Sequence, residues 1–248
     1  MSDAWQQIGA PVAGGVLLIG DHASNTVPAD IDLGIGTSLL GTHIALDIGV
    51  REVAHHLLRA AAIDCAILGG VSRLVVDCNR DETAPGVIPI ASDGHVIPGN
   101  ALSHAAHQAR ITRFYLPYHE HIAATLQTAA PAMILSLHSF TPSLASSDEA
   151  RPWDIGILYN HDDRLARLAI PAFAALGLIV GDQLPYSGKL LNHTMNRHAE
   201  GHEIPYLGIE MRQDKVKNPA GQARFADMIG QIVTQCRHHL AHGLNDGQ

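Results

Sequence analysis

Side chains capable of chemistry follow directly after apolar runs in this sequence. Residues 134–137 lead into His138, and residues 16–19 are followed by Asp21 and His22. Two further apolar runs lead into Asp77, Asn79, Arg80, Glu210 and Arg212. Because open α/β sheets bind ligands at the carboxyl ends of their strands, we expect these groups to meet at one edge of a sheet. Histidines combined with carboxylates and arginines predict a metal-dependent hydrolase for an anionic substrate.

Asp47 is the candidate for a third metal ligand beside the two histidines. It lies among apolar neighbours in Ala-Leu-Asp-Ile-Gly, where a buried carboxylate without a cation would be costly. His43 precedes it by four residues, so the two share a face of the helix expected over residues 42–62. The alternatives are a solvated polar pair on that helix and, for His22, an exposed position beside an Asx turn.

Arginines are the candidates for anion binding. Arg73 and Arg80 bracket an apolar run that we expect to be a strand over residues 71–80, and Asn79 adds an amide donor. The two arginines are seven residues apart, so on a straight strand they emerge at opposite ends or faces, unless the strand bends. Arg212 is a further candidate after the last apolar run.

Composition excludes several classes of protein. The chain has 248 residues, with 16 lysines and arginines against 24 aspartates and glutamates, and this acidic balance argues against a nucleic-acid partner. No apolar stretch approaches the roughly 18 residues of a membrane span, and the first residues lack the pattern of an export signal. The three cysteines are odd in number and widely separated, which indicates reduced thiols and a cytoplasmic protein.

Strand and helix patterns alternate along the whole chain. Strands are expected at 14–19, 64–68, 71–80, 134–140, 154–159, 178–180 and 206–211, and helices at 42–62, 102–127, 162–176 and 218–243. Long loops are expected at 81–100 and 182–203. This order predicts a single α/β domain over residues 1–248, with a three-layer architecture in which helices flank a largely parallel, mixed sheet.

The sequence resembles the N-formylglutamate amidohydrolase family over nearly its entire length. The motifs that carry the resemblance include Asp-His-Ala-Ser-Asn at 21–25, Ser-Arg-Leu-Val-Val-Asp-Cys-Asn-Arg at 72–80, Leu-His-Ser-Phe-Thr-Pro at 137–142 and Ile-Glu-Met-Arg-Gln-Asp at 209–214. Their order and spacing make the match specific. The resemblance implies a fold like that of the zinc exopeptidases, which include zinc carboxypeptidases and aspartoacylases.

Site roles follow from this resemblance. It implies one Zn²⁺ ion held by His22 and His138, and a carboxylate clamp formed by Asn79 and Arg80. Relatives have glutamate three residues after the first histidine, where this chain has Asn25. We therefore favour the anionic Asp47 over Asn25 as the third ligand.

The same resemblance implies a reaction. Glu210 would act as the general base, and Arg73 would help to stabilise the oxyanion. From the residues themselves, we expect Arg80 and Arg212 each to meet one carboxylate of a small anionic N-acyl amino acid with two carboxylates. The substrate implied is N-formyl-L-glutamate, hydrolysed to formate and L-glutamate.

Other functions remain open from the residues alone. They are another N-acyl amino acid amidohydrolase, a small carboxypeptidase, and a dicarboxylate-binding module without turnover. The carboxylate of Glu210 argues against a binding module, because it would repel an anionic ligand. A serine nucleophile at Ser24 or Ser139 is disfavoured because neither serine lies in a Gly-x-Ser-x-Gly elbow.

Overall fold

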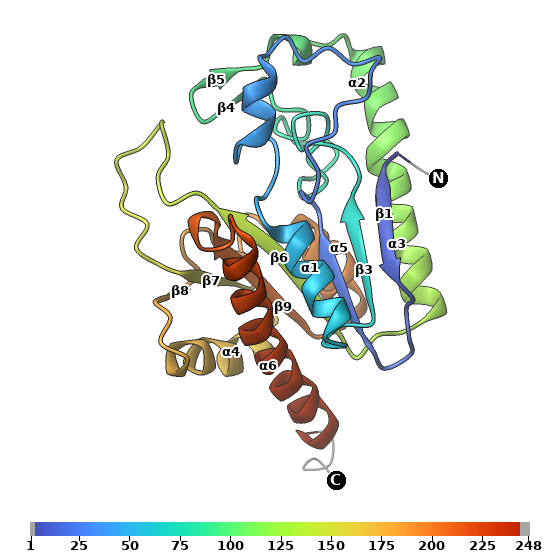
Figure 1. Cartoon of the computed structure of the whole chain (residues 1–248). Coiled ribbons are helices and arrows are strands. Elements are labelled where there is room, and N and C mark those ends of the chain that lie inside the picture. The colour runs from blue at the N-terminus through green and yellow to red at the C-terminus, as the bar shows by residue number, and fades with distance from the viewer. Residues whose placement is uncertain (1–2, 244–248) are drawn as a thin grey trace.

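A seven-stranded sheet runs through the protein (Figure 1). The structure is a computed structural model that describes residues 3–243. The strand order is β1-β3-β2-β6-β9-β7-β8. The strands are β1 (Trp5–Gly9), β2 (Val16–Gly20), β3 (Cys65–Gly69), β6 (Met133–Phe140), β7 (Ile155–Leu158), β8 (Val180–Asp182) and β9 (Tyr206–Arg212). The four central strands are parallel to one another, whereas β1 pairs antiparallel with β3 and β7 pairs antiparallel with β9. The expected largely parallel, mixed sheet is confirmed.

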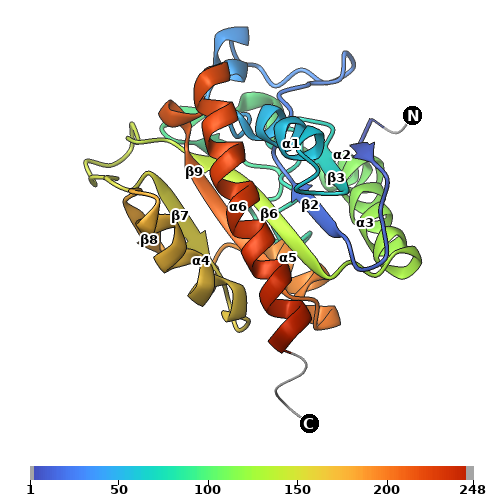
Figure 2. The ribbon, with the colours of Figure 1, turned by 60° about the horizontal axis from the view of Figure 1, so that its bottom comes forward.

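Helices cover both faces of the sheet, as Figure 2 shows. One layer contains α1 (Val50–Arg59), α4 (Arg164–Ala175) and α6 (Pro219–Gly243). The other contains α2 (His104–Arg110), α3 (Leu116–Thr128) and α5 (His193–His198). No helix within residues 3–243 is long and apolar enough to cross a membrane.

The strands explain these two layers, because both of their faces are apolar. In β2, Val16 and Leu18 pack in the cluster of α1, α4 and α6, whereas Leu17 and Ile19 pack in the cluster of α3 and α5. Strands buried on both faces read as continuous apolar runs, and such runs made β2, β6 and β9 recognisable in the sequence. The three-layer architecture is therefore confirmed.

Two expected elements are wrong in part. Residues 71–80 form turns instead of a strand, because the carbonyl oxygen of Ser72 accepts hydrogen bonds from the backbone N–H groups of Val75 and Val76. The helix expected from residue 42 begins only at Val50, because Gly49 has a φ of 85°, in the left-handed region that interrupts a helix. Short apolar runs do not distinguish a strand from a buried turn.

Other differences are smaller. The edge strand β1 was not predicted, and the helix over 102–127 is α2 joined to α3 through a π-helical turn at Ile111–Tyr115. Pro117 directly follows the π-helical turn, and the residues before it stay helical, so it does not break the helix. The loop over 81–100 contains the hairpin of β4 (Ala91–Ser92) and β5 (His95–Val96), and the loop over 182–203 contains α5.

A buried histidine pair attaches α5 to α3. His119 Nδ1 lies 2.9 Å from His198 Nε2, and His119 Nε2 lies 3.0 Å from the carbonyl oxygen of Cys78. Burial, reinforced by His198, lowers the pKa of His119 to about 3, and burial lowers that of His198 to about 4. Both imidazoles are therefore neutral at physiological pH.

Replacing Gly49 with alanine should destabilise the protein more than replacing Gly14. Both glycines have positive φ, which costs an alanine about 1–2 kcal/mol. A Cβ at Gly49 would also lie 2.6 Å from the backbone oxygen of Val216, whereas a Cβ at Gly14 meets no atom within 4 Å. Gly49→Ala should therefore cost about 2–5 kcal/mol in urea unfolding, and Gly14→Ala about 1–2 kcal/mol. An equal loss of stability in the two variants would show that Val216 can move away from the added methyl group at no measurable cost.

The histidine pair predicts how stability depends on pH. Below the ordinary histidine pKa of about 6.5, these two histidines bind protons in the unfolded chain but stay neutral in the folded protein. The free energy of unfolding therefore falls as the pH drops towards 4. His119→Gln retains a donor to Cys78 but does not titrate. Between pH 7.5 and pH 5 it should lose about 1–2 kcal/mol less stability than wild type. The exposed control His239→Gln should follow wild type, and parallel curves for all three proteins would contradict the neutral pair.

Candidate metal centre

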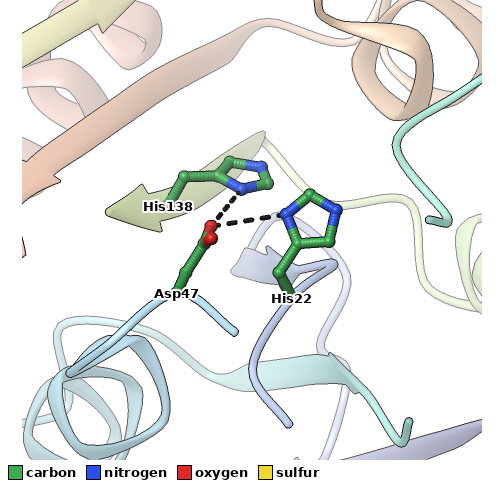
Figure 3. A group of neighbouring side chains, drawn as sticks. All are labelled: His22, Asp47 and His138. Atoms are coloured by element: carbon green, nitrogen blue, oxygen red, sulfur yellow. Dashed lines mark hydrogen bonds and ion pairs between the residues drawn. The ribbon is translucent and has the colours of Figure 1, made fainter. Parts of the chain in front are cut away.

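Three buried side chains converge at the carboxyl end of the central strands. His138 Nδ1 lies 2.8 Å from Asp47 Oδ2, and His22 Nδ1 lies 3.4 Å from the same oxygen. Figure 3 shows that both imidazoles present a ring nitrogen to this carboxylate. His22 comes from the loop after β2, Asp47 from the turn before α1 and His138 from β6 itself. These are the residues that the apolar runs and the isolated carboxylate predicted to meet.

A second carboxylate faces the other ring nitrogen of each histidine. His22 Nε2 lies 2.7 Å from Asp77 Oδ1, and His138 Nε2 lies 3.3 Å from Asp21 Oδ2. Asp21 is held in turn by the hydroxyl groups of Tyr118 and Thr194, each donating at 2.8 Å. In metal sites, such outer carboxylates fix the tautomer and the orientation of ligating histidines.

Electrostatics favour a cation between these groups. Burial lowers the pKa of His138, but Asp21 and Asp47 outweigh it, and the net pKa lies well above the usual value. Burial and Arg73 lower the pKa of His22, yet Asp77 and Asp47 raise it overall. Burial raises the pKa of Asp47, and both histidines together with Arg73 bring it below its usual range.

The donor set fits a divalent metal ion. One ligand atom from each of His22, Asp47 and His138 lies within 4.8 Å of the others, and all three side chains are buried. Ligand atoms at about 2.0–2.1 Å from a tetrahedral zinc ion lie roughly 3.3 Å apart, close to the separations from Asp47 to the two imidazoles. Two imidazoles and one carboxylate are typical of catalytic zinc, which keeps a position for substrate.

Arg73 binds the carboxylates on both sides of His22. Its Nη1 donates to Asp47 Oδ1 at 3.0 Å, and its Nη2 donates to Asp77 Oδ2 at 3.2 Å. Arg80 approaches the same Asp77 oxygen through Nε at 3.8 Å. Because residues 71–80 form turns, the two arginines meet around one carboxylate instead of emerging at opposite ends of a strand.

Glu210 lies next to His138, because the two residues are paired across the parallel strands β9 and β6. Both face the layer of α3 and α5, since they alternate with residues that pack in the opposite layer. Glu210 Oε2 is buried and has no hydrogen-bond partner in the described part of the chain. Burial and Asp47 raise the pKa of Glu210, which reaches about 7 despite the opposing effect of His138.

A pocket of about 530 Å³ connects these groups. Its lining includes His22, Asp47, Arg73, Asn79, Arg80, His138, Tyr186 and Glu210. Asp93, in the turn between β4 and β5, connects three segments around the pocket. Its carboxylate lies 2.9 Å from His43 Nε2 and accepts hydrogen bonds from the backbone N–H groups of Ala145 and Ser146. The volume is in the usual range for a small-molecule site.

The remaining predicted residues lie elsewhere or have other partners. Arg212 does not line the pocket, because its guanidinium bonds to Asp214 and lies 3.7 Å from Asp154. Asn25 is exposed and does not line this pocket, whereas Asp47 is buried and contacts both histidines. Ser139 lines the pocket, but its hydroxyl donates to the carbonyl oxygen of Ile48.

Sequence reasoning did not assign roles to Asp21, Asp77 or Tyr186. The two aspartates were expected at this edge of the sheet, and their role could have been inferred, since each lies close in the sequence to a group that it supports: Asp21 precedes His22, and Asp77 lies between the two arginines. Tyr186 carries no such signal, because it lies in a long loop without periodicity.

Comparisons with known proteins agree with this fold. A solved structure of a gene product from Agrobacterium tumefaciens has a TM-score of 0.87 and 31% identity, with 94% of each chain covered. The N-formylglutamate amidohydrolase from Ralstonia eutropha JMP134 has a TM-score of 0.74 at 18% identity, covering 97% of this chain and 99% of that one, which supports the fold alone. A comparison with curated proteins gave no match. Residues 14–216 match the model of one family, and the chain therefore belongs to the N-formylglutamate amidohydrolase family.

Proposed function

We propose that this amidohydrolase depends on zinc and cleaves the amide bond of an acidic N-acyl amino acid. N-formyl-L-glutamate, which would give formate and L-glutamate, is the substrate that we infer from the family. The observation that carries the proposal is the buried oxygen of Glu210, which has no hydrogen-bond partner among residues 3–243 and lies beside the group of His22, Asp47 and His138. A buried carboxylate in an anion-binding pocket is hard to explain unless it accepts a proton during the reaction.

His22, Asp47 and His138 would hold the ion, with Asp77 and Asp21 orienting the two imidazoles. Zinc bound there would supply a Lewis acid for the acyl carbonyl and would lower the pKa of a water molecule. Glu210 would take a proton from the attacking water and return it to the amine nitrogen as the C–N bond breaks. Arg73, fixed between Asp47 and Asp77, would stabilise the negative charge that develops on the acyl oxygen.

Asn79 and Arg80 would bind a carboxylate of the substrate. Asn79 Oδ1 accepts a hydrogen bond from the backbone N–H of Thr194 at 3.0 Å, which leaves the amide N–H groups of Asn79 available to a ligand. Arg80 retains two terminal nitrogens beyond its Nε contact with Asp77, and a guanidinium suits bidentate binding of a carboxylate. Arg212 has no part in this proposal, because its partners lie outside the pocket.

Metal analysis of ligand variants tests the proposed centre. His22→Ala and His138→Ala should each lose stoichiometric zinc. Asp47→Asn should lower zinc affinity at least about 100-fold, since even an outer partner of a ligand typically contributes about 10–100-fold. The matched control Asn25→Ala should bind zinc like wild type in a chelator competition. Stoichiometric zinc in both histidine variants would refute the ligand assignment. A larger loss of zinc affinity in Asn25→Ala than in Asp47→Asn would show that Asp47 is not the third ligand.

Kinetics of Glu210→Gln test the proton acceptor. Glutamine keeps the shape of the side chain but cannot accept a proton, so kcat for N-formylglutamate should fall about 10²–10⁴-fold while KM and zinc content persist. Glu120→Gln, on the exposed side of α3, should behave as wild type. Near-normal kcat with a lower melting temperature would make Glu210 structural. A zinc-loaded wild type that releases no amine from any N-acyl amino acid would overturn the proposed function.

A further inference from the structure

Arg151 is a buried cation for which the described residues supply no carboxylate partner. It lies in the loop between β6 and β7, and only 7% of its surface is exposed. Its Nη1 donates to the backbone oxygen of Thr141 at 3.3 Å and to the hydroxyl oxygen of Tyr186 at 3.0 Å. Its Nε is buried and has no hydrogen-bond partner between residues 3 and 243. The guanidinium also lies over the Tyr186 ring, 5.0 Å from the centroid.

The other arginines in or near the pocket each lie within ion-pair distance of a carboxylate. Arg73 and Arg80 both approach Asp77, and Arg212 pairs with Asp214. A charge that is buried without a counter-ion is costly unless something compensates it. Arg151 is separated from the pocket by Tyr186, a residue of the lining, so an anion that binds next to Tyr186 would supply the missing charge.

The hydrogen bond between these residues determines what Tyr186 can do. A guanidinium has donors alone, so the phenolic oxygen of Tyr186 accepts from Arg151. The hydroxyl hydrogen of Tyr186 is then left for another acceptor, and the structure shows no bond donated by this hydroxyl to the described residues. Burial and Glu210 raise the pKa of Tyr186, so the phenol keeps its proton. A neutral donor backed by a positive charge is suited to an anionic oxygen.

We propose that Tyr186 and Arg151 form a second carboxylate subsite, which selects N-acyl amino acids with an acidic side chain. Tyr186 donates its hydroxyl hydrogen to the side-chain carboxylate, and Arg151 positions the phenol and supplies the compensating charge. Asn79 and Arg80 meet the α-carboxylate. The inference rests on the proposed function, and it assigns to Tyr186 the second carboxylate that the sequence had assigned to Arg212.

Two substrates that differ in one group test the subsite. N-formylglutamate and N-formylglutamine share the scissile amide and the α-carboxylate, but the second has a neutral side-chain amide. Tyr186→Phe should raise KM for N-formylglutamate about 10- to 100-fold and change KM for N-formylglutamine less than about 3-fold. Arg151→Gln should act in the same direction, and Arg151→Lys should restore part of the preference because it keeps the charge.

Two controls separate the subsite from general effects. Arg80→Ala should weaken both substrates equally, because both carry the α-carboxylate. Tyr159→Phe removes a hydroxyl that donates to Asp182 outside the pocket and should leave the preference unchanged. Equal losses on both substrates in Tyr186→Phe would overturn the subsite, and so would a fall in kcat without a change in KM.

Binding without turnover distinguishes failure of the subsite from failure of the proposed function. If the zinc-loaded wild type hydrolyses neither substrate, calorimetry with glutarate and its monoamide replaces kinetics. Tyr186→Phe should then abolish most of the preference of wild type for glutarate. A wild type that binds both compounds equally would refute the subsite whether or not the enzyme is active.

Discussion

The candidate site depends on one carboxylate, Asp47, held between two imidazoles inside the protein. Its side chain meets His22, His138 and Arg73, and its backbone N–H donates to the carbonyl oxygen of His22 at 2.9 Å. A buried carboxylate is stable only when cations and hydrogen-bond donors surround it. The segments that supply those partners must therefore stop next to Asp47, and this constraint explains why the turn at Gly49, the loop after β2 and the end of β6 meet there.

The groups around Asp47 need partners of opposite charge in their turn. Asp21 and Asp77 compensate the histidines, Arg73 and Arg80 compensate Asp77, and α5 contributes Thr194 to hold Asp21. Glu210 and Arg151 are exceptions, since each is buried without a partner of opposite charge within ion-pair distance in residues 3–243. Such uncompensated groups are candidates to act on a ligand, in addition to the paired Arg73 and Arg80.

The sequence predicted the central strands and the convergence at their ends, because strands buried on both faces leave long apolar runs with a sharp polar end. It failed where local backbone geometry decides the outcome. Ser72 turns an apolar run away from the sheet, and Gly49 delays the start of the helix expected from residue 42 until Val50. It also placed Arg212 in the site, since the direction of a side chain depends on partners such as Asp154 that lie far away in the sequence.

Gly208 has a role that its lack of a side chain makes easy to overlook. A Cβ there would lie 2.6 Å from the backbone oxygen of Leu158, so β9 can approach β7 this closely only with glycine at that position. Leu207, Ile209 and Met211 pack in the layer of α1, α4 and α6, whereas Gly208 and Glu210 face the other layer, so a shift of one residue would bring an apolar side chain into the close contact with Leu158. A shift of that kind would turn Glu210 into the opposite helical layer. The absence of a methyl group two residues upstream thus favours the register that orients the proposed base.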